Sequence, residues 1–396
     1  HREKTMSEKI PKGWKWVKLG EVAEIKMGQS PESKYYNDKG IGLPFLQGNK
    51  TFGYKYPEID IFCSNPIKIA KKGEVLISVR APVGDINIAN QDICIGRGLA
   101  SINSLFNQNE FLFYCLKYSK NDLLASETGT VFGSINKDTL NNFSIPLPPL
   151  PEQKAIAEVL SSLDDKIDLL HRQNKTLEEM AMTLFRQWFI EPTKDGLPEG
   201  WEQCTLNDLC LKIASGGTPS TKIKEYYDGH INWYSTNELN DGFLFESEKK
   251  ITLQGLENSS AKLFPKGTIV MAIYAAPTVG RLGILTNEAS FNQAACGLVP
   301  NTEVCSTEFL YLYLKSEREN LNIMASGSAQ QNLNVNKIKT YPTIKVPKNI
   351  MIRFNKIVIP IFHKIENNSY QIQTLEKIRD TLLPKLMSGE VRVKIM

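Results

Sequence analysis

Two long stretches of this sequence repeat each other, and each repeat ends in a segment with a coiled-coil pattern. Thr-Leu-Glu-Glu-Met at residues 176–180 returns as Thr-Leu-Glu-Lys-Ile at residues 374–378. Further matches relate residues 110–112 to 308–310, Gly13-Trp14 to Gly200-Trp201, and Ser30-Pro31 to Thr218-Pro219. The offset grows from about 187 to about 198 residues along the chain, as small loop insertions would produce. A duplicated domain with a duplicated helical arm predicts a pseudo-two-fold fold, which suits a two-fold target or two copies of one partner.

Each half begins with a globular block in which strand signals outnumber helix signals. Residues 75–79 and 86–89 are rich in β-branched and aliphatic side chains and follow Gly or Pro turns, and residues 268–273 and 282–285 are their counterparts. Shorter helices are predicted over residues 110–118 and 307–318. This pattern predicts two similar α+β domains built on mixed or antiparallel sheet.

Each half ends in an arm whose seam positions alternate three and four residues apart, as in a coiled coil. The first seam consists of Ile156, Leu160, Leu163, Ile167, Leu170, Asn174, Leu177, Ala181, Leu184 and Trp188. The second consists of Phe354, Val358, Ile361, Ile365, Asn368, Ile372, Leu375, Arg379, Leu382 and Leu386. We predict that the two arms pair as an antiparallel two-helix coiled coil.

Proline and glycine mark the ends of the arms. Residues 146–151 are proline-rich and predict a stiff extended connector, with the first helix starting near Glu152. Pro360 and Pro384 lie inside the second arm, so we expect a kink or a local break at each. Gly389 predicts the end of the second helix.

Each seam contains one asparagine, and antiparallel alignment about the helix centres places Asn174 opposite Asn368. A buried pair of this kind costs stability but fixes the register of a coiled coil. The alternative is that each asparagine faces water at a gap in the packing.

Composition limits the class of protein. Hydrophobic residues make up 41% of the chain, enough for packed cores, and the net charge of +4 permits a nucleic-acid partner without demanding one. The seven cysteines form no CxxC pair and the four histidines are scattered, so we expect buried thiols in a reducing compartment and no metal site. There is no long uncharged apolar run, so we expect no membrane association and a cytoplasmic location.

A search for catalytic motifs yields no catalytic residue. The nearest match to the Asn/Asp-Pro-Pro-aromatic turn of an amino-methyltransferase is Asn65-Pro66-Ile67-Lys68, which lacks the second proline and the aromatic residue. No Gly-x4-Gly-Lys-Ser/Thr loop is present to hold phosphates. The short acidic runs at residues 58–60 and 246–248 have no clear partner for metal-assisted hydrolysis.

Matched polar and aromatic clusters are candidates for DNA contact. Lys34, Tyr35 and Tyr36 follow the Ser-Pro turn of the first half, and Lys224, Tyr226 and Tyr227 follow the Thr-Pro turn of the second. Lysine can contact phosphate, and tyrosine can donate hydrogen bonds or stack on bases. The alternative is that the tyrosine rings pack on a sheet edge.

Five further side chains lie in matched loops. Arg80 and Arg281 flank the two Pro-x-Gly loops and are candidates for phosphate or guanine contact. Arg97 aligns with Gln293, which would let the two halves read different bases because glutamine pairs well with adenine. Gln330 lies in a polar loop of the second half that is also compatible with a structural turn. The turn motifs match between the halves while the loops differ, as a reader of an asymmetric two-part sequence requires.

Taken together, these motifs resemble the specificity subunit of type I restriction-modification systems over almost the whole chain. The most specific segments are residues 146–157, the helix after them, and the closing Leu-Leu-Pro-Lys-Leu-Met-Ser-Gly-Glu-Val at residues 382–391. The main departure is Pro347-Lys348-Asn349-Ile350, which replaces the fuller proline-and-Glu-Gln motif and leaves the start of the second helix open.

The resemblance implies a fold, a function and partners. It implies a target recognition domain over residues 1–150, a long helix over 151–190, a second recognition domain over 191–347, and a second helix and tail over 348–396. Each domain would read one half of a bipartite DNA site, with the coiled coil setting the gap. The helices would dock two methyltransferase subunits carrying S-adenosylmethionine, joined by motor-nuclease subunits. This chain would bind double-stranded DNA, hold no cofactor and carry no catalytic centre.

Two other functions stay open from the sequence. The chain could be the specificity part of a fused restriction-methylation enzyme, which a gene continuing into a catalytic domain would favour. It could also be a coiled-coil adaptor that binds only protein, which a failure to select any DNA sequence would favour.

Overall fold

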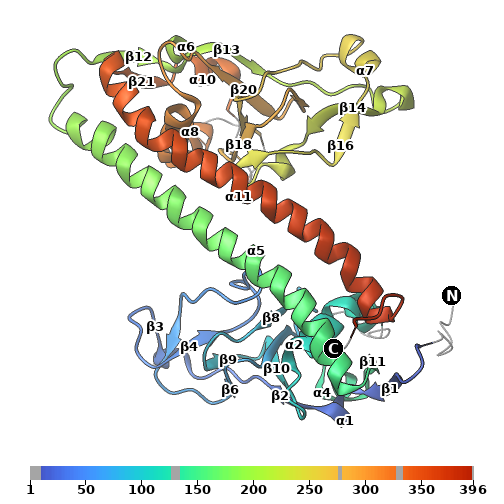
Figure 1. The fold of residues 1–396 in the computed structure, drawn as a ribbon. Coiled ribbons are helices and arrows are strands. Elements are labelled where there is room, and N and C mark those ends of the chain that lie inside the picture. The colour runs from blue at the N-terminus through green and yellow to red at the C-terminus, as the bar shows by residue number, and fades with distance from the viewer. Residues whose placement is uncertain (1–9, 126–133, 275–278, 327–332, 395–396) are drawn as a thin grey trace. The chain divides into compact units, whose positions relative to one another are not determined.

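The computed structural model describes residues 10–125, 134–274, 279–326 and 333–394, and they form two compact units (Figure 1). The first unit combines residues 1–170 with residues 372–396, and the second consists of residues 171–371. Each unit therefore contains one globular domain together with a segment of both long helices.

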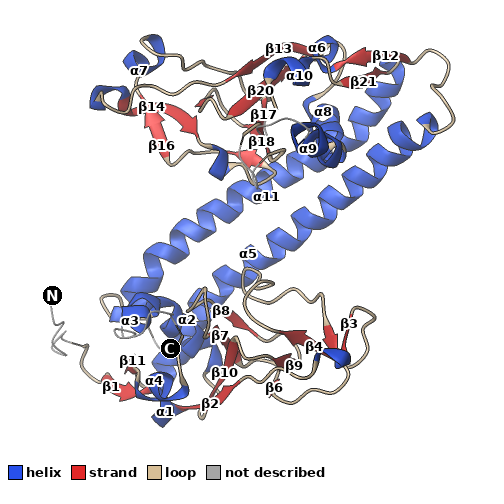
Figure 2. Cartoon of the chain, turned by 180° about the vertical axis from the view of Figure 1, so that it is seen from behind, coloured by secondary structure: helices blue, strands red, loops and turns tan. Residues whose placement is uncertain are grey.

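The first unit is a mixed α+β domain. Its helices are α1 (Leu19–Val22), α2 (Asn109–Tyr118), α3 (Lys120–Ala125) and α4 (Lys137–Asn142), with a short 3-10 turn at Ser33–Tyr35. Its strands are β1 (Lys15–Lys18), β2 (Ala23–Met27), β3 (Tyr36–Asn37), β4 (Leu43–Leu46), β5 (Phe62–Cys63), β6 (Ile69–Ala70), β7 (Val75–Ser78), β8 (Ile86–Ile88), β9 (Ile93–Ile95), β10 (Leu99–Ser104) and β11 (Ser144–Leu147). Helix α2 packs against β7, β8 and β10 (Figure 2).

The second unit has the same kind of architecture. Its helices are α6 (Leu206–Leu209), α7 (Leu253–Glu257), α8 (Thr307–Ser316), α9 (Arg318–Ser326) and α10 (Val335–Lys339), with 3-10 turns at Glu191–Thr193, Lys224–Tyr226 and Thr236–Glu238. Its strands are β12 (Glu202–Thr205), β13 (Cys210–Ser215), β14 (Tyr227–Tyr234), β15 (Phe243–Leu244), β16 (Lys249–Ile251), β17 (Ile269–Ala272), β18 (Leu282–Leu285), β19 (Ser290–Phe291), β20 (Ala295–Pro300) and β21 (Pro342–Lys345).

Sheet order confirms that the two domains are copies of one scaffold. The strands run β2-β10-β7-β8 in the first unit and β13-β20-β17-β18 in the second, where β15 adds an edge strand. The register also matches, because Ala100 lies opposite Ile77 and Cys296 lies opposite Met271. The predicted α+β class and internal repeat are therefore correct.

Two long helices run through the structure: α5 (Leu150–Phe185), continued by a π-helical turn at Arg186–Ile190, and α11 (Lys348–Ser388). Every predicted seam position on both helices is buried or half-buried. In the first unit Asp164 contacts Arg379, and in the second Asn174 contacts Asn368 while the ring of Phe185 lies 6.4 Å from that of Phe354. The paired residue number on α11 falls as that on α5 rises, so the helices are antiparallel within each unit.

One detail of the predicted arms is wrong, and a second is narrowed. Residues 146–151 are not an extended connector throughout, because Pro146 and Leu147 belong to β11 and α5 already begins at Leu150. A proline in a first helical turn costs nothing there, since that N–H has no partner within the helix. A local break at Pro360 or Pro384 is absent from α11, which stays helical over all 41 residues, so of the two expected effects only a kink stays a prediction. Packing of its seam against α5 offsets the single lost backbone bond at each proline.

Asn368 is fully buried and its amide donates to Asn174 Oδ1 at 2.9 Å. Asn174 in turn donates to Ser369 Oγ at 3.1 Å. The predicted asparagine pair is thus present, and the alternative of a water-facing Asn368 is excluded. Its role in setting the register stays a prediction.

The pair can be tested with a double-mutant cycle. We expect Asn368→Leu to lower the free energy of unfolding by about 1–2 kcal/mol, because Asn174 then loses its partner in a half-buried seam. The double variant Asn174→Leu/Asn368→Leu should regain most of that loss, since an apolar pair fills the seam. Urea unfolding of the single and double variants measures both steps. A double variant no more stable than the single one would contradict this account.

Candidate nucleic-acid interface

A tight turn leaves the first long strand of each domain and positions the candidate residues. Gly28 donates to Leu99 O at 2.9 Å, and its counterpart Gly216 donates to Ala295 O at 3.0 Å. A Cβ at Gly28 would lie 2.2 Å from the carbonyl oxygen of Gly96, and one at Gly216 would lie 2.1 Å from that of Phe291. Both turns therefore require glycine, and they fix the backbone on which the next residues sit.

The turn brings the matched pair Arg97 and Gln293 to equivalent places. Ser30 Oγ accepts from the Arg97 backbone N–H at 3.1 Å and donates to Gln47 Oε1 at 2.9 Å. In the second domain the hydroxyl of Thr218 donates to Gln293 Oε1. Both Arg97 and Gln293 are exposed, so each domain presents a different polar side chain beside the same turn.

The second tyrosine of each predicted cluster has a structural role. The Tyr36 hydroxyl donates to Pro31 O and the Tyr227 hydroxyl to Pro219 O, both at 2.7 Å. The Tyr36 ring stacks on Phe45 with centroids 4.5 Å apart. These contacts favour the alternative that the rings pack on the sheet edge.

The rest of that cluster is closer to solvent. Tyr35 and Tyr226 are half-buried, and Lys34 and Lys224 are exposed. The Lys34 ammonium lies 5.0 Å from the Tyr35 ring centroid and pairs with Glu32 at 2.7 Å. Lys34 therefore offers a partly neutralised charge for phosphate contact.

A basic side chain from a later helix of each domain holds the Pro-x-Gly loop in place: Lys120 on α3 and Arg318 on α9. Lys120 pairs with Asp85 at 2.7 Å in the first domain. In the second, Arg318 donates to both carboxylate oxygens of Asp241, at 2.8 and 2.5 Å, and to Gly280 O at 2.9 Å. Arg80 is exposed and Arg281 half-buried beside these loops, whereas Gln330 lies outside the described residues.

The Asp241–Arg318 pair predicts acid-sensitive stability in the second unit. Burial opposes ionisation of Asp241, but the hydrogen bonds and charge of Arg318 outweigh it and hold the pKa below its ordinary 3.8. The stabilisation is therefore present above about pH 3.8 and is lost as pH falls through the lower pKa of the folded state. We expect Asp241→Asn to cost about 1–3 kcal/mol at neutral pH, and the difference from wild type to shrink in acid.

A matched control is Asp228→Asn, an exposed aspartate with nearly the same backbone φ, 60° against 58° at Asp241. Urea unfolding near neutral pH and near pH 3 measures both variants. An Asp241→Asn deficit that persists in acid would contradict the ion-pair explanation.

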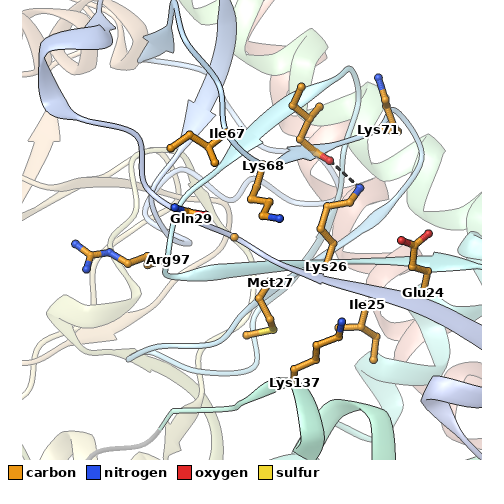
Figure 3. A pocket seen from close by; sticks show the side chains of 12 residues that line it. Glu24, Ile25, Lys26, Met27, Gln29, Ile67, Lys68, Lys71, Arg97 and Lys137 are labelled. Atoms are coloured by element: carbon orange, nitrogen blue, oxygen red, sulfur yellow. Dashed lines mark hydrogen bonds between the residues drawn. The ribbon is translucent and has the colours of Figure 1, made fainter.

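An open hollow of about 880 Å³ lies against β2 in the first domain. Figure 3 shows the side chains around it, which come from β2 and the turn after it, from the β6 region, from the loop before β10 and from α4. Five of the twelve lining residues are basic and one is acidic: Lys26, Lys68, Lys71, Arg97 and Lys137, against Glu24. Of the residues predicted from the sequence, Arg97 lines the hollow, whereas Lys34, Tyr35, Tyr36 and Arg80 do not.

Two of these charges are neutralised and three are not. Lys26 donates to Ile69 O at 2.9 Å and lies 3.8 Å from Glu74, and Lys71 pairs with Asp92 at 2.7 Å. Lys68, Arg97 and Lys137 are exposed and form no ion pair within the part of the chain that the structure describes. The hollow therefore presents unpaired positive charge, and sequence reasoning missed its lysines because they come from three distant segments.

Burial suppresses the reactivity of one cysteine in each domain. Burial raises the pKa of the Cys115 and Cys296 thiols to about 12, so both stay protonated and unreactive at neutral pH. No group of three or more His, Cys, Asp or Glu side chains arranged for a metal ion occurs among the described residues. None of the helices in that same part of the chain is long and apolar enough to cross a membrane.

The sequence matches the family described as the type I restriction modification DNA specificity domain twice, over residues 11–179 and over residues 198–379. The chain belongs to this family. The two matches coincide with the two copies of the scaffold, and members of the family act as specificity subunits of type I restriction-modification systems, which confirms the resemblance found in the sequence.

The matches with individual relatives cover nearly the whole length of both chains. The specificity subunit of the type I restriction enzyme MjaIX of Methanocaldococcus jannaschii is 28% identical over 98% of this chain and 95% of its own length. That of the HindI enzyme of Haemophilus influenzae is 26% identical over 96% and 99%. The crystal structure of a type I S subunit from M. genitalium has a TM-score of 0.67 at 18% identity, covering 97% of this chain and 98% of that one, and shares the fold.

Proposed function

We propose that this chain reads a bipartite, asymmetric DNA site, one half with each globular domain. The observation that carries the proposal is the repeat itself: one scaffold occurs twice, and matched places carry Arg97 in one copy and Gln293 in the other. Arginine suits guanine and glutamine suits adenine, so two such copies would read different bases. Family membership supports DNA as the ligand.

The long helices would set the gap between the half-sites and dock two methyltransferase subunits. Two large apolar side chains at the same place in the repeat support two copies of one partner: Met180 is 50% exposed and Ile378 is 43% exposed. The methyltransferase subunits would bring S-adenosylmethionine, and motor-nuclease subunits would complete a restriction complex in the cytoplasm.

This chain would carry recognition and no catalysis. The protonated cysteines, the absence of a catalytic motif in the sequence and the structural use of Tyr36 and Tyr227 support that division of labour. The chemistry would reside in the partner subunits.

Methylation mapping tests the proposal. We expect a cell that expresses this chain with its methyltransferase to methylate one motif made of two short parts separated by a fixed gap. Exchanging one globular domain for that of a relative should change one part and leave the other and the gap unchanged. Absence of any two-part motif would refute the proposal, and so would a domain exchange that changes both parts.

A further inference from the structure

The lysines beside β2 have counterparts in the second domain. Aligning the repeats at the Lys-Gly that precedes β7 and β17 matches Lys68 with Lys262. Lys262 donates to Ser215 O at 3.3 Å, at the end of β13, the strand equivalent to β2. Both domains therefore place a lysine from the same segment against the same strand.

Further lysines complete the second site from other segments. The Lys212 ammonium on β13 lies 4.4 Å from the ring centroid of Phe264, two residues along the chain from Lys262. Lys339 is the last residue of α10, the helix equivalent to α4, whereas Lys137 is the first residue of α4, so each helix contributes one lysine from a different end. Burial raises the pKa of Cys296 on β20, and Lys339 and Lys262 both oppose that rise, so the two ammonium groups lie near this strand.

We propose that these two lysine-lined faces hold the DNA backbone, one face in each domain, and that Arg97 and Gln293 reach the bases from their rims. The inference rests on the proposed function and names the residues that carry it out. Lysine ammonium groups suit phosphates as point charges and fix position, whereas base edges need planar groups. The arrangement separates the two tasks, with Lys68 and Lys137 inside the first face and Arg97 at its edge (Figure 3).

The turn geometry explains how the side chains at the rim of each face, Arg97 and Gln293, are positioned before DNA binds. Ser30 accepts from the Arg97 backbone N–H and fixes the backbone from which that side chain extends, whereas the Thr218 hydroxyl donates to the Gln293 side chain itself. A side chain supported in this way loses less freedom on binding than one on a free loop. Changing one rim residue would therefore change the base read while leaving the phosphate contacts in place.

The experiment uses the complex of the full chain with its methyltransferase and duplex DNA carrying its mapped motif. We expect Lys68→Gln/Lys137→Gln to weaken binding roughly tenfold and to reduce the slope of log affinity against log salt by about two, because each lysine neutralises about one phosphate. Lys262→Gln/Lys339→Gln should do the same through the second domain. The control Lys12→Gln/Lys15→Gln makes the same charge change at exposed positions in or just before β1, outside both long helices, and should leave the slope unchanged.

The rim residues give a separate readout. Methylation mapping of Arg97→Gln should change one base in one part of the motif, from guanine toward adenine, and leave the other part intact. Gln293→Arg should change only the other part. A thermal unfolding curve equal to that of wild type confirms that each variant is folded.

The outcomes distinguish the two proposals. A wild-type complex that methylates no two-part motif refutes the proposed function. A normal motif with unchanged salt slopes in both lysine variants refutes the lysine faces alone, as does a slope that falls equally in the Lys12→Gln/Lys15→Gln control. A motif unaltered by Arg97→Gln and by Gln293→Arg refutes the reading role of the rim.

Discussion

Replacing Asp164 with alanine lowers the free energy of unfolding of the first unit by about 3–5 kcal/mol, the cost of removing one partner from a buried ion pair. The Asp164 carboxylate on α5 is fully buried. Arg379 on α11 donates to it at 3.0 Å and the Tyr54 hydroxyl at 2.8 Å. Without the carboxylate, Arg379, whose side chain is only 12% exposed, keeps its charge in the interior. The same change removes the hydrogen bond of the Tyr54 hydroxyl to α5, one of the contacts that join this residue of the globular domain to α5 and α11.

Hydrogen exchange localises this effect. Amides of α5 and α11 within the first unit should exchange faster in Asp164→Ala, while those of β13, β17 and β20 in the second unit should not. Glu158→Ala, an exposed acidic residue on the same helix, is the control and should cost less than about 0.5 kcal/mol. Combining Asp164→Leu with Arg379→Leu should recover part of the loss, because no unpaired charge stays behind at that pair. A loss below about 1 kcal/mol in Asp164→Ala would show that water already reaches the site.

Replacing Arg392 with alanine should destabilise the start of the chain by about 2–4 kcal/mol, although Arg392 lies near its end. Arg392 donates through Nε and Nη2 to Glu152, with the Nη2 contact at 2.7 Å. The Glu152 side chain is only 2% exposed, and it also accepts from the indole N–H of Trp14 at 3.0 Å. Loss of the guanidinium leaves a buried carboxylate with the Trp14 N–H as its remaining side-chain donor in the described structure. The side chain of Arg392 is 45% exposed, which places the expected cost below that of Asp164→Ala.

Hydrogen exchange of local amides again measures the effect. Amides of β1 and β11, which pair with each other beside Trp14, should lose protection in Arg392→Ala. Lys394→Ala removes a nearby exposed charge and is the control. The variant Arg392→Lys should keep only part of the protection of β1 and β11, because an ammonium group cannot make the two-point contact with Glu152. Unchanged protection of β1 in Arg392→Ala would contradict the account.

The same contacts explain the sequence motifs that marked the family. The Gly-Trp of the first half and the Glu-Gln after the proline run are far apart in the sequence, yet Trp14 and Glu152 share a hydrogen bond. In the second half the glutamate position is Ile350, and the matching Trp201 packs its ring 6.0 Å from that of Phe189. An apolar contact replaces the polar one, which accounts for the departure at residues 347–350.

Periodicity predicted the parts of the fold that depend on local pattern. The seams, the antiparallel pairing and the asparagine pair follow from spacing, because a heptad repeat determines which side chains face a partner helix. The buried role of Asp164 could not be predicted, since it lies beside the seam and its partners Tyr54 and Arg379 come from remote segments. Lys55 is similar: it is 1% exposed and pairs with Asp165 at 2.6 Å, which nothing in its local sequence indicates.

The candidate interface was predictable to a lesser degree. Alignment of the two halves found Arg97 and Gln293, which precede the matched strands β10 and β20. It did not find Lys68 and Lys137, because a basic face made of three segments exists only once the chain is folded. It also assigned DNA contact to Tyr36 and Tyr227 on composition, whereas their hydroxyl protons bind proline carbonyls.

The division into units also bears on how the protein matures during synthesis. Residues 171–371 form one uninterrupted stretch, so the second unit has all its parts soon after residue 371 leaves the ribosome. Most of the first unit is synthesised earlier, but the unit also contains residues 372–396, which include Arg379 and Arg392. Nascent chains commonly fold from the N-terminus onward. Here we expect the reverse order. The first unit is made earlier but completes its fold later, under the protection of chaperones, once residues 372–396 have been made and can pack against it.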